Sequence, residues 1–134
     1  MKGIVAVVIY GIILVLSDAI YLKQIAPSFG NMLQKIQGKP MRMKLWAAVI
    51  VYLALLGLWY NFIFLDRLHY SYWENIGRAF LLGFFTYAVY DFTNLALIED
   101  YRIDLAVIDS LWGGLLFAGT TGLFLKLVKI LRLH

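Results

Sequence analysis

LWAAVIVYLALLGLWYNFIFL, residues 45–65, contains no charged side chain. A helix of about 20 apolar residues is long enough to cross the ~30 Å hydrocarbon layer of a bilayer. Three further stretches, residues 3–22, 76–98 and 105–125, are nearly as apolar and carry only isolated charged side chains. The sequence therefore predicts an all-α, polytopic membrane protein with four transmembrane helices.

Composition supports this class. Hydrophobic residues make up 63% of the 134 residues and charged residues 15%, whereas soluble proteins average about 45–50% and 25%. One soluble core of this size could not bury so much apolar surface. We expect a single domain, residues 1–134, that is located in the membrane and uses lipid as its solvent.

The first apolar stretch also has features of a signal peptide. Lys2 supplies a basic flank, and residues 17–19 resemble the small-residue site at which signal peptides are cleaved. The apolar run continues through residues 20–22, so we expect an uncleaved first helix.

The first loop, residues 23–44, is expected to contain a short amphipathic helix. Pro27 suits the first turn of a helix and Gly38 suits its end. An irregular polar loop with apolar anchors is the alternative. The net charge of +4 points to anionic lipid headgroups rather than to nucleic acid. The basic residues are Lys23, Lys35, Lys39, Arg42 and Lys44 in this loop and Lys126, Lys129, Arg132 and His134 in the tail.

Single aspartates lie in three of the four predicted spans: Asp18, Asp91 and Asp109. An aspartate near the centre of a membrane helix costs roughly 2.5–3.5 kcal/mol, so it usually faces protein or water and marks function. With four spans, the first and third loops share one side of the membrane. Measured from that side, the three residues lie about 6, 10 and 6 Å deep at 1.5 Å per residue. We therefore predict that the three carboxyl groups converge.

Polar and aromatic neighbours extend this cluster. Asn94 shares a helix face with Asp91, and Tyr21 shares one with Asp18. Both can hydrogen-bond a carboxyl group or a ligand. Three close carboxylates would not all ionise without a cation, so the cluster suits a proton, a cation or a small solute. The predicted binding site comprises Asp18, Tyr21, Asp91, Asn94, Asp109 and Trp112, with Arg42, Lys44 and Arg102 as counterions at its mouth.

A structural role for the aspartates remains the alternative, because polar residues in membrane helices also simply bond neighbouring helices. Small residues at four-residue spacing, Gly114, Ala118 and Gly122, predict a helix contact within one subunit or in a homodimer. Aromatic residues at the predicted span ends are typical of a membrane-interface belt: Trp46, Tyr70, Tyr72, Trp73 and Tyr101.

Familiar cofactor and metal motifs do not occur in the sequence. It has two histidines and no cysteine, so we expect no transition-metal site. No phosphate-binding glycine loop with its lysine and no paired histidines of a zinc helix are found, so no cofactor is expected and catalytic residues stay unassigned.

Three sequence strings together resemble one family. They are Asp18-Ala-Ile-Tyr21-Leu22, Tyr90-Asp91-Phe-Thr-Asn94-Leu-Ala96 and Asp109-Ser-Leu-Trp112-Gly113. The chain resembles, over nearly its whole length, small predicted membrane proteins of bacteria and some large DNA viruses of algae (domain of unknown function 2177). The resemblance implies four spanning helices and no particular activity.

The leading hypothesis is a proton- or cation-linked small-solute transporter or channel-like protein that uses the aspartates. A structural or regulatory membrane protein is one alternative, and an intramembrane enzyme acting on lipid is another. The sequence leaves enzymatic activity open and favours the non-enzymatic hypotheses.

Overall fold

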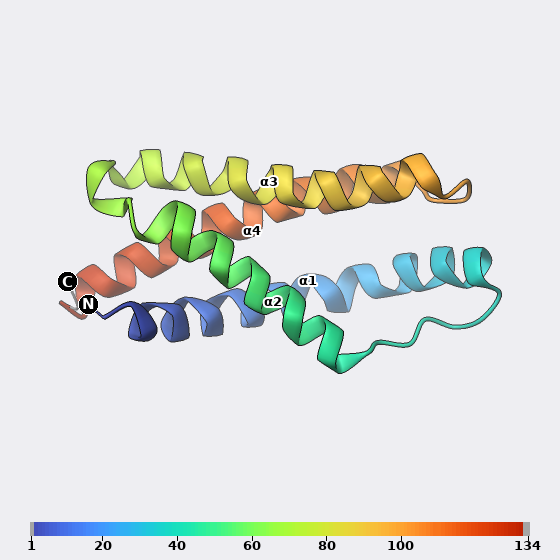
Figure 1. The fold of residues 1–134 in the computed structure, drawn as a ribbon, viewed down its shortest axis with the longest axis horizontal. Coiled ribbons are helices and arrows are strands. Elements are labelled where there is room, and N and C mark those ends of the chain that lie inside the picture. The colour runs from blue at the N-terminus through green and yellow to red at the C-terminus, as the bar shows by residue number, and fades with distance from the viewer. Residues whose placement is uncertain (1, 133–134) are drawn as a thin grey trace.

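A computed structural model describes residues 2–132 of the chain. Within this range four helices are long and apolar enough to cross a membrane, and no strand is present. They are α1 (Gly3–Gln37), α2 (Leu45–Trp59), α3 (Tyr72–Leu97) and α4 (Ile103–Ile130) (Figure 1). The four predicted spans are thus confirmed. His134 of the predicted basic tail lies outside the described residues.

Helix α1 is longer than predicted. It runs unbroken over 35 residues with Pro27 inside it, about 52 Å at 1.5 Å per residue. The separate amphipathic helix expected in the first loop is therefore wrong, because its residues continue α1. Pro27 has no N–H, so one backbone hydrogen bond of the helix is missing there. This end of α1 packs against the α3–α4 turn, where Met32 and Tyr101 are buried in one cluster. The helix ends as predicted at Gly38, whose φ of 73° is left-handed.

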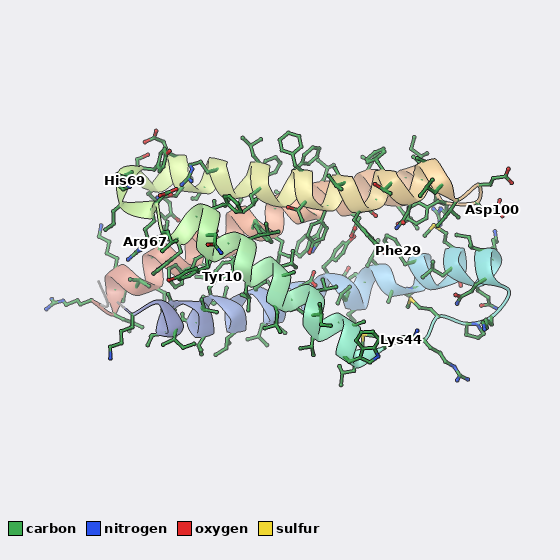
Figure 2. All side chains as sticks on the ribbon, in the orientation of Figure 1. Tyr10, Phe29, Lys44, Arg67, His69 and Asp100 are labelled. Atoms are coloured by element: carbon green, nitrogen blue, oxygen red, sulfur yellow. The ribbon has the colours of Figure 1, made fainter. Side chains whose placement is uncertain are left out.

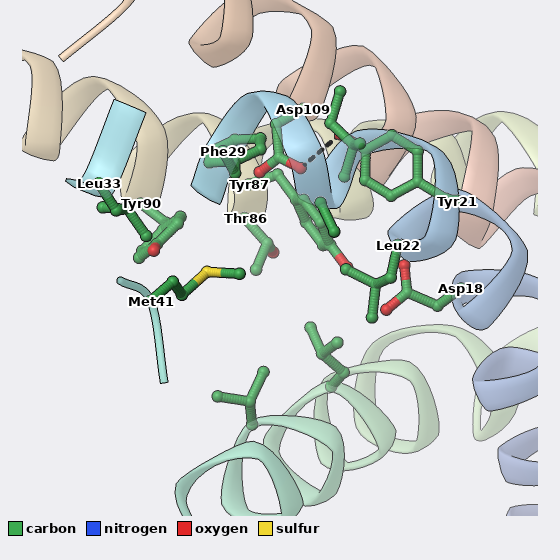
Figure 3. Close-up of a pocket in the computed structure, with 14 residues that line it drawn as sticks. Asp18, Tyr21, Leu22, Phe29, Leu33, Met41, Thr86, Tyr87, Tyr90 and Asp109 are labelled. Carbon is green, nitrogen blue, oxygen red and sulfur yellow. Dashed lines mark hydrogen bonds between the residues drawn. The ribbon is translucent and has the colours of Figure 1, made fainter. Parts of the chain in front are cut away.

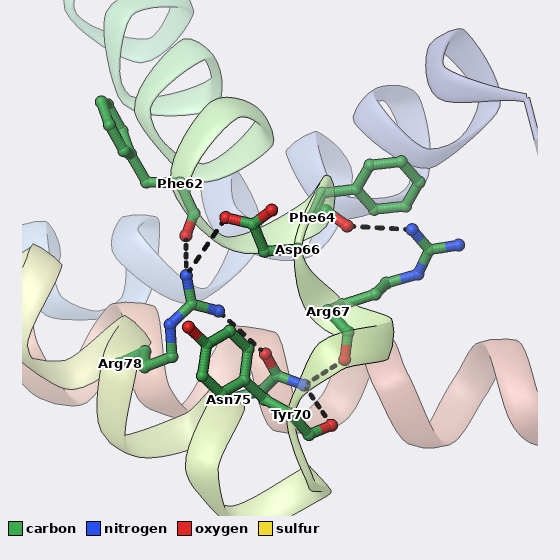
Figure 4. A network of polar contacts seen from close by, with 7 residues as sticks. All are labelled: Phe62, Phe64, Asp66, Arg67, Tyr70, Asn75 and Arg78. Atoms are coloured by element: carbon green, nitrogen blue, oxygen red, sulfur yellow. Dashed lines mark hydrogen bonds and ion pairs between the residues drawn. The ribbon is translucent and has the colours of Figure 1, made fainter.

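The junction between α2 and α3 satisfies its own backbone groups. Helix α2 continues into a π-helical turn, η1 (Tyr60–Phe64), and a short 3₁₀ turn, η2 (Arg67–His69), precedes α3. Arg78 donates to the carbonyl oxygen of Phe62 at 2.6 Å and pairs with Asp66 at 3.7 Å (Figure 4). Asn75 donates to the carbonyl oxygen of Arg67. Carbonyl groups freed by the irregular turn thus find side-chain donors.

Helices α3 and α4 pack closely side by side (Figure 1). Their closest approach is at Gly83 and Gly113, where a Cβ on Gly83 would fall 2.8 Å from the Cβ of Phe117. The predicted ridge of small residues also faces α3, since Gly114 contacts Phe80 and Gly122 contacts Tyr72. These two glycines of the ridge are covered within the chain, so they do not offer the surface predicted for a homodimer.

Two buried clusters lie at opposite ends of the bundle. The larger includes Tyr10 and Trp59, whose rings stack 3.7 Å apart, and the smaller joins the end of α1 to the α3–α4 turn. Figure 2 shows His69 at the end that holds the termini and Asp100 at the opposite end, as the predicted topology requires. Helix α2 crosses obliquely, and the loop of residues 38–44 runs back along the molecule to reach its start (Figure 1). The predicted site lies between the two clusters.

Candidate functional site

Asp18 joins three helices through its two oxygens. Tyr52 of α2 donates its hydroxyl to Oδ2 at 2.5 Å, and the indole Nε1 of Trp112 in α4 donates to Oδ1 at 3.0 Å. Only 6% of Asp18 is exposed. Both donors are neutral, so they stabilise a buried carboxylate without cancelling its charge.

Asp109 accepts a hydrogen bond from a residue of α1 that lies about one turn after Asp18. The hydroxyl of Tyr21 donates to its Oδ1 at 2.9 Å (Figure 3). The ring of Tyr21 also stacks on Trp112, with centroids 4.6 Å apart and planes 12° from parallel. Since Trp112 bonds Asp18, the two aspartates are linked through a stacked aromatic pair.

Asp91 is fully buried, and only one of its two carboxyl oxygens has a hydrogen-bond donor among the described residues. Its Oδ1 accepts a hydrogen bond from the Tyr101 hydroxyl at 3.0 Å, while Oδ2 has no donor among residues 2–132. Burial raises the pKa of Tyr101 above its ordinary value, so this hydroxyl keeps its proton and remains a donor. The Asp109 side chain of α4 is a near neighbour of Asp91. Two carboxyl groups therefore lie close together in the interior of the bundle.

The three aspartates form a chain rather than one open cluster. Asp18 and Asp109 are joined through the stacked rings of Trp112 and Tyr21, and Asp91 neighbours Asp109, so the three carboxyl groups lie near one another. The predicted end of the first span, Leu22, lies inside α1, which continues to Gln37, about 28 Å beyond Asp18. Asn94, predicted to bond a carboxyl group or a ligand, lies near the Tyr90 and Tyr101 hydroxyl groups.

None of the three aspartates has a basic partner in the described range. The ion pairs there are Arg78–Asp66 and Arg102–Asp104. Arg102, predicted as a counterion, instead binds Asp104 through two hydrogen bonds, and Asp104 raises the pKa of Arg102. No group of three acidic, histidine or cysteine side chains between residues 2 and 132 is arranged to hold a metal ion. Any positive charge at the buried carboxyl groups must come from a proton or a ligand.

A cavity of about 480 Å³ reaches two of these aspartates. Asp18, Tyr21 and Asp109 lie on one part of its wall, whereas Leu33 and Met41 lie on the other side (Figure 3). Asp91 does not line the cavity, and it neighbours Asp109. The site thus consists of two carboxyl groups that line the cavity, those of Asp18 and Asp109, and a third, that of Asp91, that does not line it.

Two residues of the network were not predicted. Tyr52 lies in the charge-free second span. A hydroxyl group among apolar neighbours was the only sign in the sequence that this residue bonds a polar partner. Tyr101 was assigned to the interface belt, yet it is 6% exposed and bonds Asp91. Tyr72 of the same belt donates to the carbonyl oxygen of Gly122. Position at a span end did not distinguish these inward-facing tyrosines from lipid-facing ones.

Comparison with known proteins places the chain in a family. Residues 3–125 match the family model described as "Predicted membrane protein (DUF2177)". The chain belongs to this family, as its motifs suggested, and is a multi-pass membrane protein. No curated protein and no solved structure gives a significant match.

Proposed function

We propose that this protein is a small carrier or channel-like membrane protein that binds a proton, a cation or a small cationic solute at its buried carboxyl groups. The neighbouring pair Asp91 and Asp109 is the observation that carries this proposal. Asp91 is fully buried, and its Oδ2 lacks a donor among the described residues. Two carboxylates close together repel strongly at low dielectric, so the pair is stable when it shares a proton or holds a cation.

The order of the residues supports a path for the proton. Asp109 lines the cavity, whereas Asp91 does not line it and neighbours Asp109. A proton that enters through the cavity reaches Asp109 first and can pass to the free Oδ2 of Asp91. A proton and a cationic solute would then compete for the same negative charge, which is the linkage that proton-driven exchange requires.

Asp91→Asn in the full chain tests this proposal, with the exposed Asp100→Asn as the matched control. Infrared spectra of reconstituted protein at several pH values report the carbonyl band of a protonated carboxyl group. We expect this band in the wild type and in Asp100→Asn, and its loss in Asp91→Asn, with little change in melting temperature.

In proteoliposomes carrying an internal pH dye, proton uptake should be lost with the same substitution. An unchanged band, or unchanged uptake, in Asp91→Asn would contradict the proposal. Loss of folded protein would instead assign Asp91 a structural role.

A second candidate is an intramembrane enzyme acting on lipid. The mainly apolar lining of the cavity beside Asp18 and Asp109 favours it, because two carboxyl groups can act as general acid and base. Incubation of the protein with bilayer lipids, followed by mass spectrometry, tests for turnover. Product that disappears in Asp109→Asn would support the enzyme, and intact lipids would argue for binding alone.

A structural role is favoured at Asp18 in particular. Its two bonds to Tyr52 and Trp112 hold α1, α2 and α4 together. If all three aspartates act only in this way, neutral substitutions at each should impair assembly equally, and the infrared band should be absent from the wild type.

A further inference from the structure

The cavity has the size and lining of a small-molecule site. Its volume of about 480 Å³ lies within the range of about 300–1,000 Å³ that such sites occupy. Most of the wall is apolar, with side chains such as Leu22, Ile25, Phe29, Leu33, Met41 and Val51. A ligand that fills it needs an apolar body.

Several of the lining residues are open to the surroundings of the protein. Leu22 is 44% exposed, Met41 45% and Val51 56%, and they come from α1, from the loop before α2, and from α2. Because α1 and α2 are membrane helices, their exposed apolar faces meet lipid. The cavity is therefore accessible from the bilayer.

The polar part of the wall is acidic. Asp18 and Asp109 line the cavity, and the lining contains no lysine or arginine. Four hydroxyl groups also line the cavity, and two of them are engaged, since Tyr21 donates to Asp109 and Thr86 donates to the carbonyl oxygen of Leu82. The hydroxyl groups of Tyr87 and Tyr90 are the other neutral donors of the wall. An anionic head such as a fatty acid carboxylate or a lipid phosphate would meet like charge here. A cationic head would meet two carboxyl groups and the ring faces of Tyr21 and Tyr87.

We infer that this cavity binds a single-chain amphipathic amine, with its ammonium group between Asp18 and Asp109 and its chain directed toward Met41. The inference rests on the proposed function, for which it supplies the class of solute. Asp91, which neighbours Asp109, adds a third carboxyl group, with no basic partner among the described residues, to this end of the site.

Binding of decylamine, decanol and decanoate to the full chain in nanodiscs tests the inference, with native mass spectrometry as the readout. We expect saturable binding of decylamine, at least tenfold weaker binding of decanol, and no specific binding of decanoate. Asp109→Asn should weaken decylamine binding at least tenfold. Equal binding of the amine and the carboxylate would overturn the inference.

A second pair of variants tests the location without altering charge. Val51→Trp fills the mouth of the cavity and should abolish decylamine binding. Val89→Trp adds the same bulk to an exposed position of α3, 69% exposed, that does not line the cavity, and should leave binding unchanged. Retained binding in Val51→Trp would place the amine elsewhere and refute the assignment.

The two proposals fail in different ways. If decylamine does not bind while the infrared band and proton uptake still depend on Asp91, the amine is the wrong solute and the proton linkage stands. If decylamine binds at Val51 and Asp109 but releases no proton in weakly buffered solution, the solute class stands and the proton linkage fails.

Discussion

Tyr52 places a neutral hydroxyl against a buried carboxyl group from within a helix that carries no charge. Its bond to Asp18 is short, at 2.5 Å, and it joins a buried carboxyl group to a half-buried tyrosine. Hydrogen bonds to charged groups contribute more than those between neutral groups, about 1.5–3 kcal/mol. Tyrosine donors of this kind hold the aspartates in position without supplying a counterion.

Tyr52→Phe should therefore destabilise the protein by about 1.5–3 kcal/mol, because Asp18 Oδ2 loses its donor while the ring is kept. Thermal unfolding in detergent, followed by circular dichroism, measures the loss. Tyr70→Phe is the control, since the Tyr70 hydroxyl makes no hydrogen bond to the part of the chain that the structure describes. Equal melting temperatures for the two variants would show that the Tyr52 bond contributes little.

The contact between α3 and α4 determines the position of two of the three aspartates. Asp91 and Asp109 belong to these helices, and they meet because the backbones approach closely at Gly83 and Gly113. Close helix contacts through small residues are a usual means of association in membranes. The carboxyl pair is thus a consequence of this crossing.

Gly83→Ala should disrupt the crossing, because the new Cβ would collide with the Gly113 carbonyl group and with Phe117. Overpacking of this kind costs typically about 1–3 kcal/mol. Gly77→Ala in the same helix is the control, since a Cβ there meets open space. That variant should be neutral or more stable by up to about 1 kcal/mol, as alanine favours helix over glycine. Chemical unfolding in mixed micelles compares the two, and equal stability would contradict the close contact.

The topology of the whole molecule has a direct labelling test. The chain contains no cysteine, so single cysteines can be introduced without a background. Lys39→Cys in the first loop and Asp100→Cys in the third should react with an impermeant maleimide from the same side of sealed vesicles. Lys2→Cys and His69→Cys should react only from the opposite side. Labelling of Lys39 and Asp100 from different sides would exclude four spans.

Much of the architecture could be predicted from the length of apolar stretches. The four spans and the end of α1 at Gly38 follow from local rules of hydrophobicity and helix capping. The continuation of α1 through Pro27 could not be predicted, because it depends on burial of Met32 against a turn far away in the sequence. The π-helical turn at Tyr60–Phe64 has no comparable sequence signal.

The sequence predicts which acidic residues form the candidate site, but not which residues they bond. A lone aspartate in an apolar stretch is visible in the sequence, since its burial needs a partner. Which partner it meets depends on how each helix is rotated about its axis. Trp112 therefore proved to bond Asp18 rather than a ligand, and Tyr21 to bond Asp109 across the bundle. The pattern of apolar and polar residues does not determine that rotation.

One continuous helix, α1, carries both the bonds to the site and the contact with the α3–α4 turn. Tyr21 bonds Asp109 of α4, and Met32 of the same helix is buried in one cluster with Tyr101. A change in the tilt of α1 relative to α4 would therefore alter the Tyr21–Asp109 bond and the Met32 contact together.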